Sequence, residues 1–174
     1  LFDEDKAPAY IARSANWLQN FCKSYDDNPF RRLVDMAKKA QEAGVIKGIL
    51  LHQGCTDNGQ RDWPERVKTV YERLLAELNL TAEECPLIVG ELVSQQDNGT
   101  CSLHNSVIAT LPLVIPTAYV VPSLGCQGNF DKLHFTADGY RELGRRYAQV
   151  MLKAEKISDV MTGKVKVKKV KKSK

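Results

Sequence analysis

The sequence predicts an α/β fold, a three-layer α/β/α sandwich around a parallel, flavodoxin-like sheet. Three short apolar runs with β-branched residues, at 45–51, 86–92 and 117–121, indicate buried strands, and segments of helical spacing separate them. Strands joined through helices run parallel with right-handed crossovers, so helices cover both faces of the sheet. Sheets of this kind usually have about five strands. We therefore expect one or two strands on the amino-terminal side to be missing from this chain.

The first helix is expected to begin after Asn28, because Asn28 is a preferred N-cap and Pro29 fits the first helical turn. Apolar residues then recur at helical spacing until Gly44, which gives the range 29–43. Residues 1–27 carry few apolar side chains in register, so we expect an irregular segment with one or two helical turns.

Three further helices alternate with the strands. Asp62 followed by Glu65 is typical of a helix N-terminus, and the apolar stripe that follows reaches Leu78. A short helix is predicted over 102–111. Thr136 is expected to cap the long last helix.

The positive charge of the chain is concentrated at its carboxy-terminal end. The 174 residues carry a formal net charge of +4, but seven of the 25 basic residues lie in the last eleven positions, and without them 18 basic residues oppose 21 acidic ones, a net charge of −3. We therefore expect one domain, 1–157, and a disordered Lys-rich tail, 158–174, with polyanion binding by the tail as the alternative. A body of this charge is not expected to bind nucleic acid.

Composition argues against a membrane partner and a metal site. No apolar run approaches the ~20 residues that span a bilayer. The five cysteines are scattered without a Cys-x-x-Cys pair, which argues against zinc and allows two disulfides at most. We expect neither a metal nor another cofactor.

Polar residues follow the predicted strands where the strands lead into helices, and in a parallel sheet these loops meet at one edge. They are residues 52–57, the pair Gly90 and Glu91, and the segment 131–134. An Asp three residues before a His accepts the imidazole N–H in many sites, which leaves the other nitrogen free to take a proton from a hydroxyl nucleophile. On spacing alone, Asp131 capping a turn beside a packed His134 is the commoner outcome.

The segment after the first strand offers an amide and a thiol. The Gln53 amide is placed to donate into the crevice, as a group that stabilises an oxyanion does, although a bond to the backbone is an equally simple role. Cys55 is either a thiolate nucleophile or a buried inert thiol, and the second is more common. His104, in the short helix, has no evident partner, so we expect it to pack at the surface or the core edge.

Two motifs stand in order along the chain, GILLHQG over 48–54 and DKLHFTADGYR over 131–141. Matching segments flank them at Asn28-Pro29-Phe30, Trp63-Pro64 and Ala109-Thr110-Leu111-Pro112. Together they resemble carbohydrate esterase family 6, the acetylxylan esterase-like branch of the SGNH hydrolases. The resemblance extends over about residues 1–152.

The resemblance implies a metal-free hydrolase, secreted or periplasmic, that removes acetyl groups from plant cell-wall polysaccharide or its oligosaccharides. In such an enzyme a serine attacks the ester, a histidine takes and returns the proton, and an aspartate orients the histidine. Matched residue by residue, His134 is the base and Asp131 its orienting partner. Because two motifs occur in the family's order, we favour a catalytic role for Asp131 and His134 over a capped turn beside a packed histidine.

The same resemblance assigns the surroundings of the site. Gln53 and Gly54 would lie at the oxyanion site. Its edge would hold His52, Cys55 and Asp57. A disulfide between Cys101 and Cys126 is also implied, because relatives carry cysteines there.

The chain departs from the family pattern in two places. The usual His-Gln-Gly-Glu-Ser-Asn motif ends here in Cys55, Thr56 and Asp57, so the family glutamate is missing. The Gly-Gln-Ser-Asn block that carries the nucleophile is also absent, and we expect that serine upstream of Leu1. Three hypotheses follow: a serine carbohydrate O-acetylesterase, a non-catalytic carbohydrate-binding descendant, and an acyl transferase that uses Cys55 with His134.

Overall fold

The computed structural model describes residues 28–161. Its strands β1 (Ile49–Leu51), β2 (Leu87–Gly90) and β3 (Ala118–Val121) form one parallel sheet in the order β1-β2-β3. The predicted α/β class is therefore confirmed. The irregular segment expected over 1–27 lies outside the described residues.

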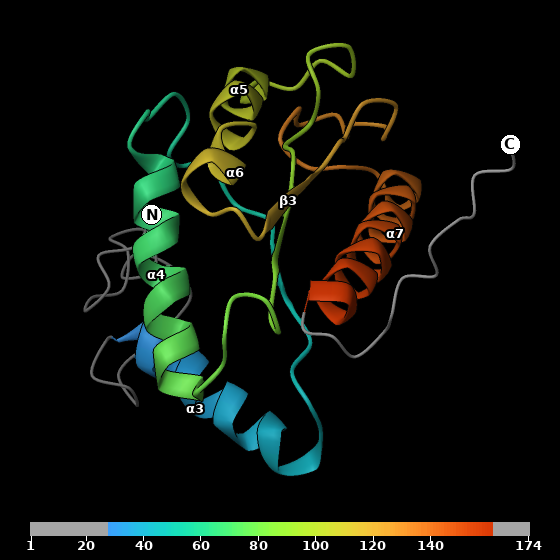
Figure 1. Cartoon of the computed structure of the whole chain (residues 1–174). Helices are drawn as coiled ribbons and strands as arrows, with labels where there is room; N and C mark the ends of the chain where they lie inside the picture. Colours follow the sequence, from blue (N-terminus) through green and yellow to red (C-terminus); the bar gives the residue numbers. More distant parts are fainter. Residues whose placement is uncertain (1–27, 162–174) are drawn as a thin grey trace, which may run out of the picture.

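Helices lie on both sides of this sheet (Figure 1). One side holds α3 (Pro29–Ala43), α4 (Trp63–Leu78), the 3-10 helix η1 (Ser102–His104), α5 (Asn105–Ile108) and α6 (Leu111–Val114). The other side is covered by α7 (Ala137–Met161). The three layers agree with the sandwich that the order of elements predicts.

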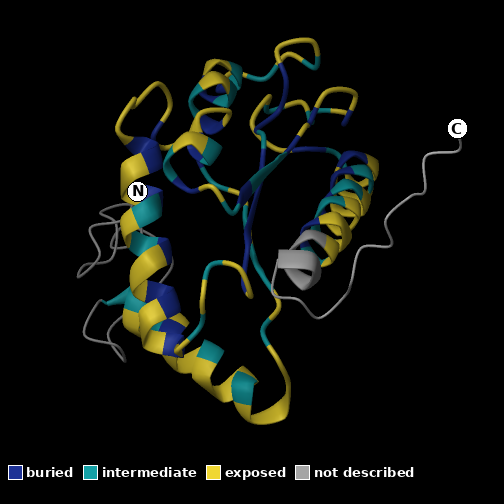
Figure 2. Cartoon of the chain, in the orientation of Figure 1, coloured by how far each residue is buried: buried dark blue, intermediate teal, exposed yellow. Residues whose placement is uncertain are grey.

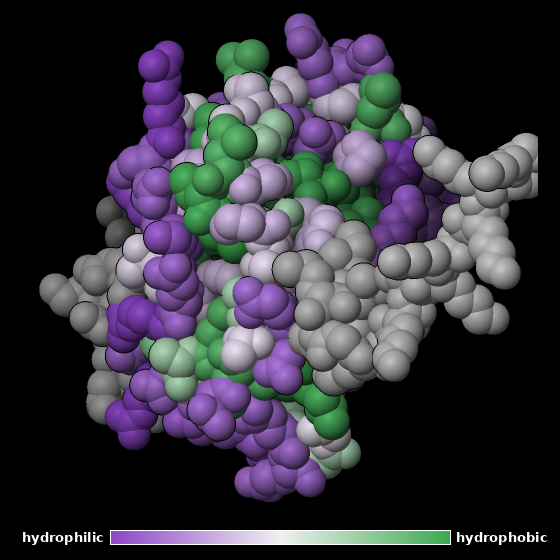
Figure 3. All heavy atoms as spheres, viewed as in Figure 1, coloured by the Kyte–Doolittle hydropathy of each residue, from purple (hydrophilic) through white to green (hydrophobic). Residues whose placement is uncertain are grey.

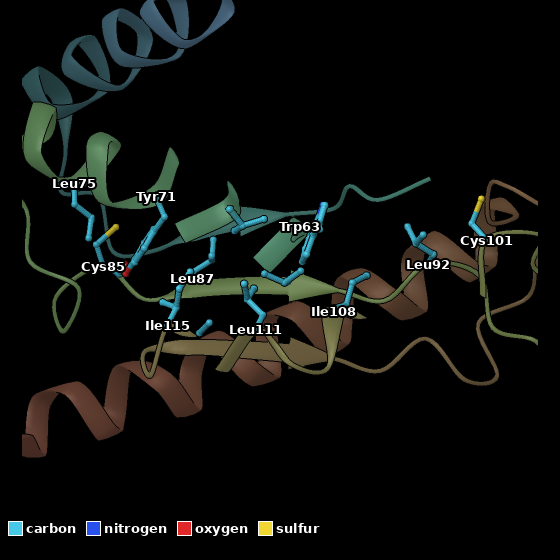
Figure 4. Close-up of a cluster of buried hydrophobic side chains, with 13 residues drawn as sticks. Trp63, Tyr71, Leu75, Cys85, Leu87, Leu92, Cys101, Ile108, Leu111 and Ile115 are labelled. Carbon is cyan, nitrogen blue, oxygen red and sulfur yellow. Dashed lines mark hydrogen bonds between the residues drawn. The ribbon is translucent and has the colours of Figure 1, made fainter. Parts of the chain in front are cut away.

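Alternating side chains of the strands build two cores. In β2, Leu87 and Val89 belong to the cluster under α4, and Ile88 belongs to the cluster under α7. Figure 4 shows Leu87 packed beneath Tyr71 and Leu75 of α4. Buried residues accordingly run through the centre of the molecule, and the outer faces of the helices are exposed (Figure 2). Central strand β2 is buried along its whole length.

Two predicted caps are present. The Asn28 side chain accepts the backbone N–H of Arg31 at 2.8 Å, and α3 ends where Gly44 follows it. Thr136 Oγ1 accepts the backbone N–H of Gly139 at 3.1 Å at the start of α7. Both helices therefore begin where side-chain acceptors satisfy first-turn N–H groups.

Three sequence predictions are wrong in detail. Asp62 makes no capping bond, because its carboxylate pairs with Arg66, Nε to Oδ2 at 2.8 Å. The helix predicted over 102–111 is divided, and Pro112, which lacks an N–H, fits the first turn of the separate helix α6. Helix α7 continues to Met161, so the boundary expected after residue 157 falls inside a helix. Tail residues 162–174 lie outside the described part of the chain.

Strand β1 forms one edge of the sheet within residues 28–161. Leu50 at its centre is 62% exposed, although it stands in the middle of an apolar strand. An apolar recess of about 500 Å³ beside β1 is lined by Phe30, Leu33 and Val70 among others. Within the described residues, this edge of the sheet therefore presents apolar surface.

The surface shows no sign of a membrane span. In the described part of the chain, no helix is both long and apolar enough to cross a bilayer. On the face drawn in Figure 3, hydrophilic side chains cover the outer side of α4, and apolar ones gather over α5 and α6. Leu103 of the adjoining η1 and Leu113 of α6 are both exposed.

Candidate active site

The loops that follow the three strands converge at one edge of the sheet. Because both strand pairs are parallel, the segments that begin at His52, Glu91 and Pro122 leave the sheet at the same end. The ring of His52 lies 5.9 Å from the ring of Phe135, which follows His134 in the chain. The Glu91 carboxylate accepts the backbone N–H of Ser123 at 2.9 Å. The structure thus brings the expected site segments together.

Asp131 holds His134 through its carboxylate. Asp131 Oδ2 lies 2.6 Å from Nδ1 of His134, and Oδ1 accepts the backbone N–H groups of His134 and Leu133, both at 3.0 Å. These hydrogen bonds, led by the one from the His134 backbone, lower the pKa of Asp131 to about 2. An ionised carboxylate only accepts, so Nδ1 of the neutral imidazole carries the proton and Nε2 presents a lone pair. The His134 side chain is 65% exposed, so this lone pair is open to a reactant.

Backbone contacts fix the turn that carries this pair. Lys132 has a left-handed backbone, with φ of 59°, and its carbonyl accepts the N–H of Thr100 at 3.0 Å and the Thr100 hydroxyl at 3.2 Å. The N–H of Asn129 donates to the carbonyl of His134 at 2.7 Å. The general-base candidate is therefore held by its own turn and by the loop that carries Thr100.

The amide of Gln53 is held at both of its polar atoms. Nε1 of Trp63 donates to Oε1 of Gln53 at 2.7 Å, and Nε2 of Gln53 donates to the carboxylate of Asp57 at 2.5 Å. An indole N–H only donates and an ionised carboxylate only accepts, so these two contacts assign the orientation of the amide. The second N–H of Gln53 makes no bond within the described residues, and such a donor suits an oxyanion site.

Gly54 lies directly against the buried ring of His104. Its φ is +152°, and a Cβ at this position would stand 2.5 Å from Cδ2 of His104, so only glycine fits. His104 is 0% exposed; its Nδ1 accepts the N–H of Gly59 at 3.2 Å, and its ring meets that of Trp63 edge-on at 5.1 Å. Burial lowers the pKa of His104, which favours the neutral ring. The packing role expected for His104 is thus confirmed, but its expected place at the surface or the core edge is wrong, because the ring is fully buried against Gly54.

Cys55 sits where that segment approaches Asp131. It is half-buried, and burial, followed by the neighbouring Cys101 thiol and the charge of Asp131, raises its pKa to about 11. A thiol with this pKa is almost wholly protonated at neutral pH. Cys55 therefore lies at the edge of the site without the character of an activated nucleophile.

The disulfide expected between Cys101 and Cys126 is absent, and both residues have free thiols. Cys101 packs in the cluster under α4, whereas Cys126 packs in the cluster under α7. The two side chains belong to different cores on opposite sides of the sheet, which is why they do not pair.

Within residues 28–161, no group of three or more His, Cys, Asp or Glu side chains could hold a metal ion.

The sequence matches a known protein family over most of its length. Residues 10–153 match the family model described as "Carbohydrate esterase, sialic acid-specific acetylesterase". The chain belongs to this carbohydrate esterase family. It is an SGNH-type esterase family, so the coarser part of the sequence resemblance is confirmed. The acetylxylan esterase-like branch is a finer assignment than the match and stays a prediction.

Three described serines use their hydroxyl groups in hydrogen bonds away from His134. Ser94, Ser106 and Ser123 each donate the hydroxyl to a nearby protein oxygen at 2.6 to 2.7 Å. No described serine is hydrogen-bonded to His134. Within residues 28–161 the candidate site therefore comprises the hydrogen-bonded pair of Asp131 and His134 and the held amide of Gln53.

Proposed function

We propose that the protein hydrolyses O-acetyl esters of carbohydrate, with His134 as general base and Asp131 as the group that orients it. The observation that carries the proposal is the 2.6 Å contact between Nδ1 of His134 and Oδ2 of Asp131. It leaves Nε2 open at the same sheet edge as the held amide of Gln53. A proton acceptor beside a fixed donor is the arrangement that acyl transfer requires.

The reaction has two halves. Nε2 of His134 takes the proton of a serine hydroxyl as its oxygen attacks the acetyl carbonyl, and the free N–H of Gln53 donates to the oxyanion. The imidazolium then gives the proton to the departing sugar oxygen. Water repeats the sequence and releases acetate. Asp131, which stays ionised down to about pH 2, stabilises the imidazolium in both halves.

The serine is proposed to arrive with a further parallel strand that pairs with the open edge of β1. Leu50 on that edge is 62% exposed, and the adjoining recess is apolar. A strand added there in parallel ends at the same edge of the sheet as β1, beside Gln53. The residue that follows it then faces the site that His134 borders.

Acetylated xylan, or an oligosaccharide from it, is the proposed substrate. The side chain of His134 is 65% exposed, which suits a polymer that lies across a surface better than a small enclosed ligand. Action on such a polymer fits a secreted or periplasmic enzyme. The family model's description names sialic acid, so O-acetylated sialic acid is the substrate to compare.

Two other functions remain as alternatives. A non-catalytic carbohydrate-binding protein is favoured by Cys55 in place of the family glutamate and by the lack of a serine at His134 within residues 28–161. An acyl transferase that uses Cys55 is disfavoured, because a pKa of about 11 keeps that thiol protonated.

An acetate-release assay on the full natural protein tests these functions. The two substrates are acetylated xylan and O-acetylated sialic acid. Loss of activity in His134→Ala but not in Cys55→Ala supports the serine esterase, and loss in both supports the acyl transferase. Asp138→Asn is the control, because Asp138 lies on the exposed start of α7 and pairs with Arg141. Saturable binding of either carbohydrate without acetate release would favour the carbohydrate-binding protein.

A further inference from the structure

Cys55 and Cys101 lie in contact near the site, although they are far apart in the sequence. The Cys101 thiol lies 3.7 Å from the carbonyl oxygen of Cys55, and after burial the neighbouring Cys101 thiol is the largest cause that raises the pKa of Cys55. Cys55 packs against the same hydrophobic cluster that contains Cys101. A disulfide requires Cβ atoms about 3.5 to 4.5 Å apart, so it forms between cysteines whose residues are already in contact, as Cys55 and Cys101 are.

The other described cysteines have no such neighbour. Cys85 lies toward the opposite end of the cluster from Cys101, beside Tyr71 (Figure 4). Cys126 is fully buried on the other side of the sheet, under α7. Within residues 28–161, Cys55 and Cys101 are therefore the cysteines placed to react with each other.

We propose that Cys55 and Cys101 form a disulfide that ties the segment carrying Gln53 to the turn carrying Asp131 and His134. Cys55 stands two residues after Gln53. Cys101 follows Thr100, whose N–H and hydroxyl both donate to the carbonyl of Lys132 inside the turn. The bond joins the segment that carries Gln53, the donor side of the site, to the turn that carries Asp131 and His134, the base side. Its formation does not depend on the esterase reaction.

A small-molecule disulfide such as oxidised glutathione is the oxidant. Cys55, which is half-buried and so the more accessible thiol, loses its proton and attacks one glutathione sulfur, releasing one glutathione thiolate. The deprotonated Cys101 then attacks the Cys55 sulfur of this mixed disulfide and releases the second glutathione. Two electrons pass from the protein to the oxidant, and the two protons end on the two glutathione thiols. Because the pKa of Cys55 is about 11, the first step accelerates as the pH rises from 7 toward 11.

Thiol counting after denaturation tests the pairing in the full 174-residue chain, which has five cysteines. The chain is incubated with oxidised glutathione at mildly alkaline pH, quenched in acid and titrated, with mass spectrometry to exclude mixed disulfides. Wild type is expected to show three free thiols. Cys55→Ser and Cys101→Ser are each expected to show four, because the remaining partner stays reduced.

Cys126→Ser is the matched control, since it removes a cysteine without touching the pair. It is expected to keep the disulfide and to show two free thiols. Loss of the disulfide in Cys126→Ser, or its persistence in Cys55→Ser, would overturn the proposal, as would five free thiols in wild type.

Thermal unfolding separates the bond from any packing effect of the substitutions. Each variant is melted in its oxidised and reduced forms, and only the difference between the two is compared. The crosslink closes a long loop, so the oxidised form of wild type and of Cys126→Ser is expected to melt about 5 °C or more above the reduced form. A similar difference in Cys101→Ser would contradict the assignment.

Discussion

The two sides of the candidate site are held in place by different kinds of contact. On the base side, the bonds of Asp131 reach residues only two and three positions away, and the side chain of His134 stands 65% exposed. On the donor side, Gln53 is held by Trp63, and the segment rests on the fully buried ring of His104. The base side is thus a local turn at the surface, and the donor side is part of the core. Substitutions on the first should change catalysis much more than stability, and substitutions on the second should change catalysis and stability together.

The largest effect is expected on the base side, from Asp131→Asn. The asparagine amide places a donor opposite Nδ1 and so favours the wrong imidazole tautomer, which is expected to lower kcat/KM for acetate release by about 10³- to 10⁴-fold. The melting temperature is expected to fall less than for a substitution in the core, because this turn lies at the surface. The comparison variant is Asp138→Asn, a neighbouring exposed carboxylate. Equal activity of the two variants would exclude the orienting role of Asp131.

On the donor side, Gln53→Leu is expected to lower kcat/KM by about 10²-fold through loss of an oxyanion donor. It is also expected to lower the free energy of unfolding by about 1 to 3 kcal/mol, because the buried Trp63 N–H loses its acceptor. Acetate assays and urea unfolding measure the two effects. A Gln53→Leu variant that is fully active, or as stable as wild type, would show that this side does not couple catalysis to stability.

These two sides also show what the sequence could and could not predict. The Asp131 and His134 pair is three residues apart, so its contact was visible as a motif, and the alternation of β2 was visible in its apolar run. The contacts of Gln53 with Trp63 and of Cys55 with Cys101 join separate elements. No local pattern encodes them. The disulfide predicted for Cys101 was therefore wrong, because its predicted partner, Cys126, lies in the other core.

The predicted cap at Asp62 failed for a related reason. Its spacing to Glu65 was correct for a capping box, but an arginine one turn into the helix offered the carboxylate a charged partner. Competition of this kind depends on side-chain positions, which a spacing rule does not include.

The packing beneath the donor side is tested by stability alone. Gly54→Ala is expected to lower the free energy of unfolding by about 2 to 4 kcal/mol, because its methyl group would collide with the buried His104 ring. Gly59→Ala is the matched control, since it also has positive φ but no atom within 4 Å of the added Cβ. It is expected to cost only about 1 to 2 kcal/mol, from backbone strain. Equal losses in denaturant unfolding would show that the contact with His104 is not restrictive.

The smallest effect concerns the pH dependence of stability on the base side. The pKa of Asp131 is about 2 in the folded chain and about 3.9 when unfolded, so the folded chain favours the ionised form. Its stabilising contribution is therefore present above about pH 4 and is lost as the pH falls toward 2. The difference in melting temperature between wild type and Asp131→Asn should shrink across this window. A difference that stays constant from pH 5 to about 2 would show that Asp131 is not selectively stabilised as the anion.

The most direct test of the account is the protonation pattern of His134, measured by ¹⁵N NMR on the labelled chain at alkaline pH, where the ring is neutral. The ionised Asp131 requires the proton on Nδ1 and a bare Nε2, and Asp131→Asn should move the ring toward the other tautomer. This measurement needs neither substrate nor nucleophile. A proton on Nε2 in wild type, or a tautomer unaffected by Asp131→Asn, would contradict the assignment of His134 as a base oriented by Asp131.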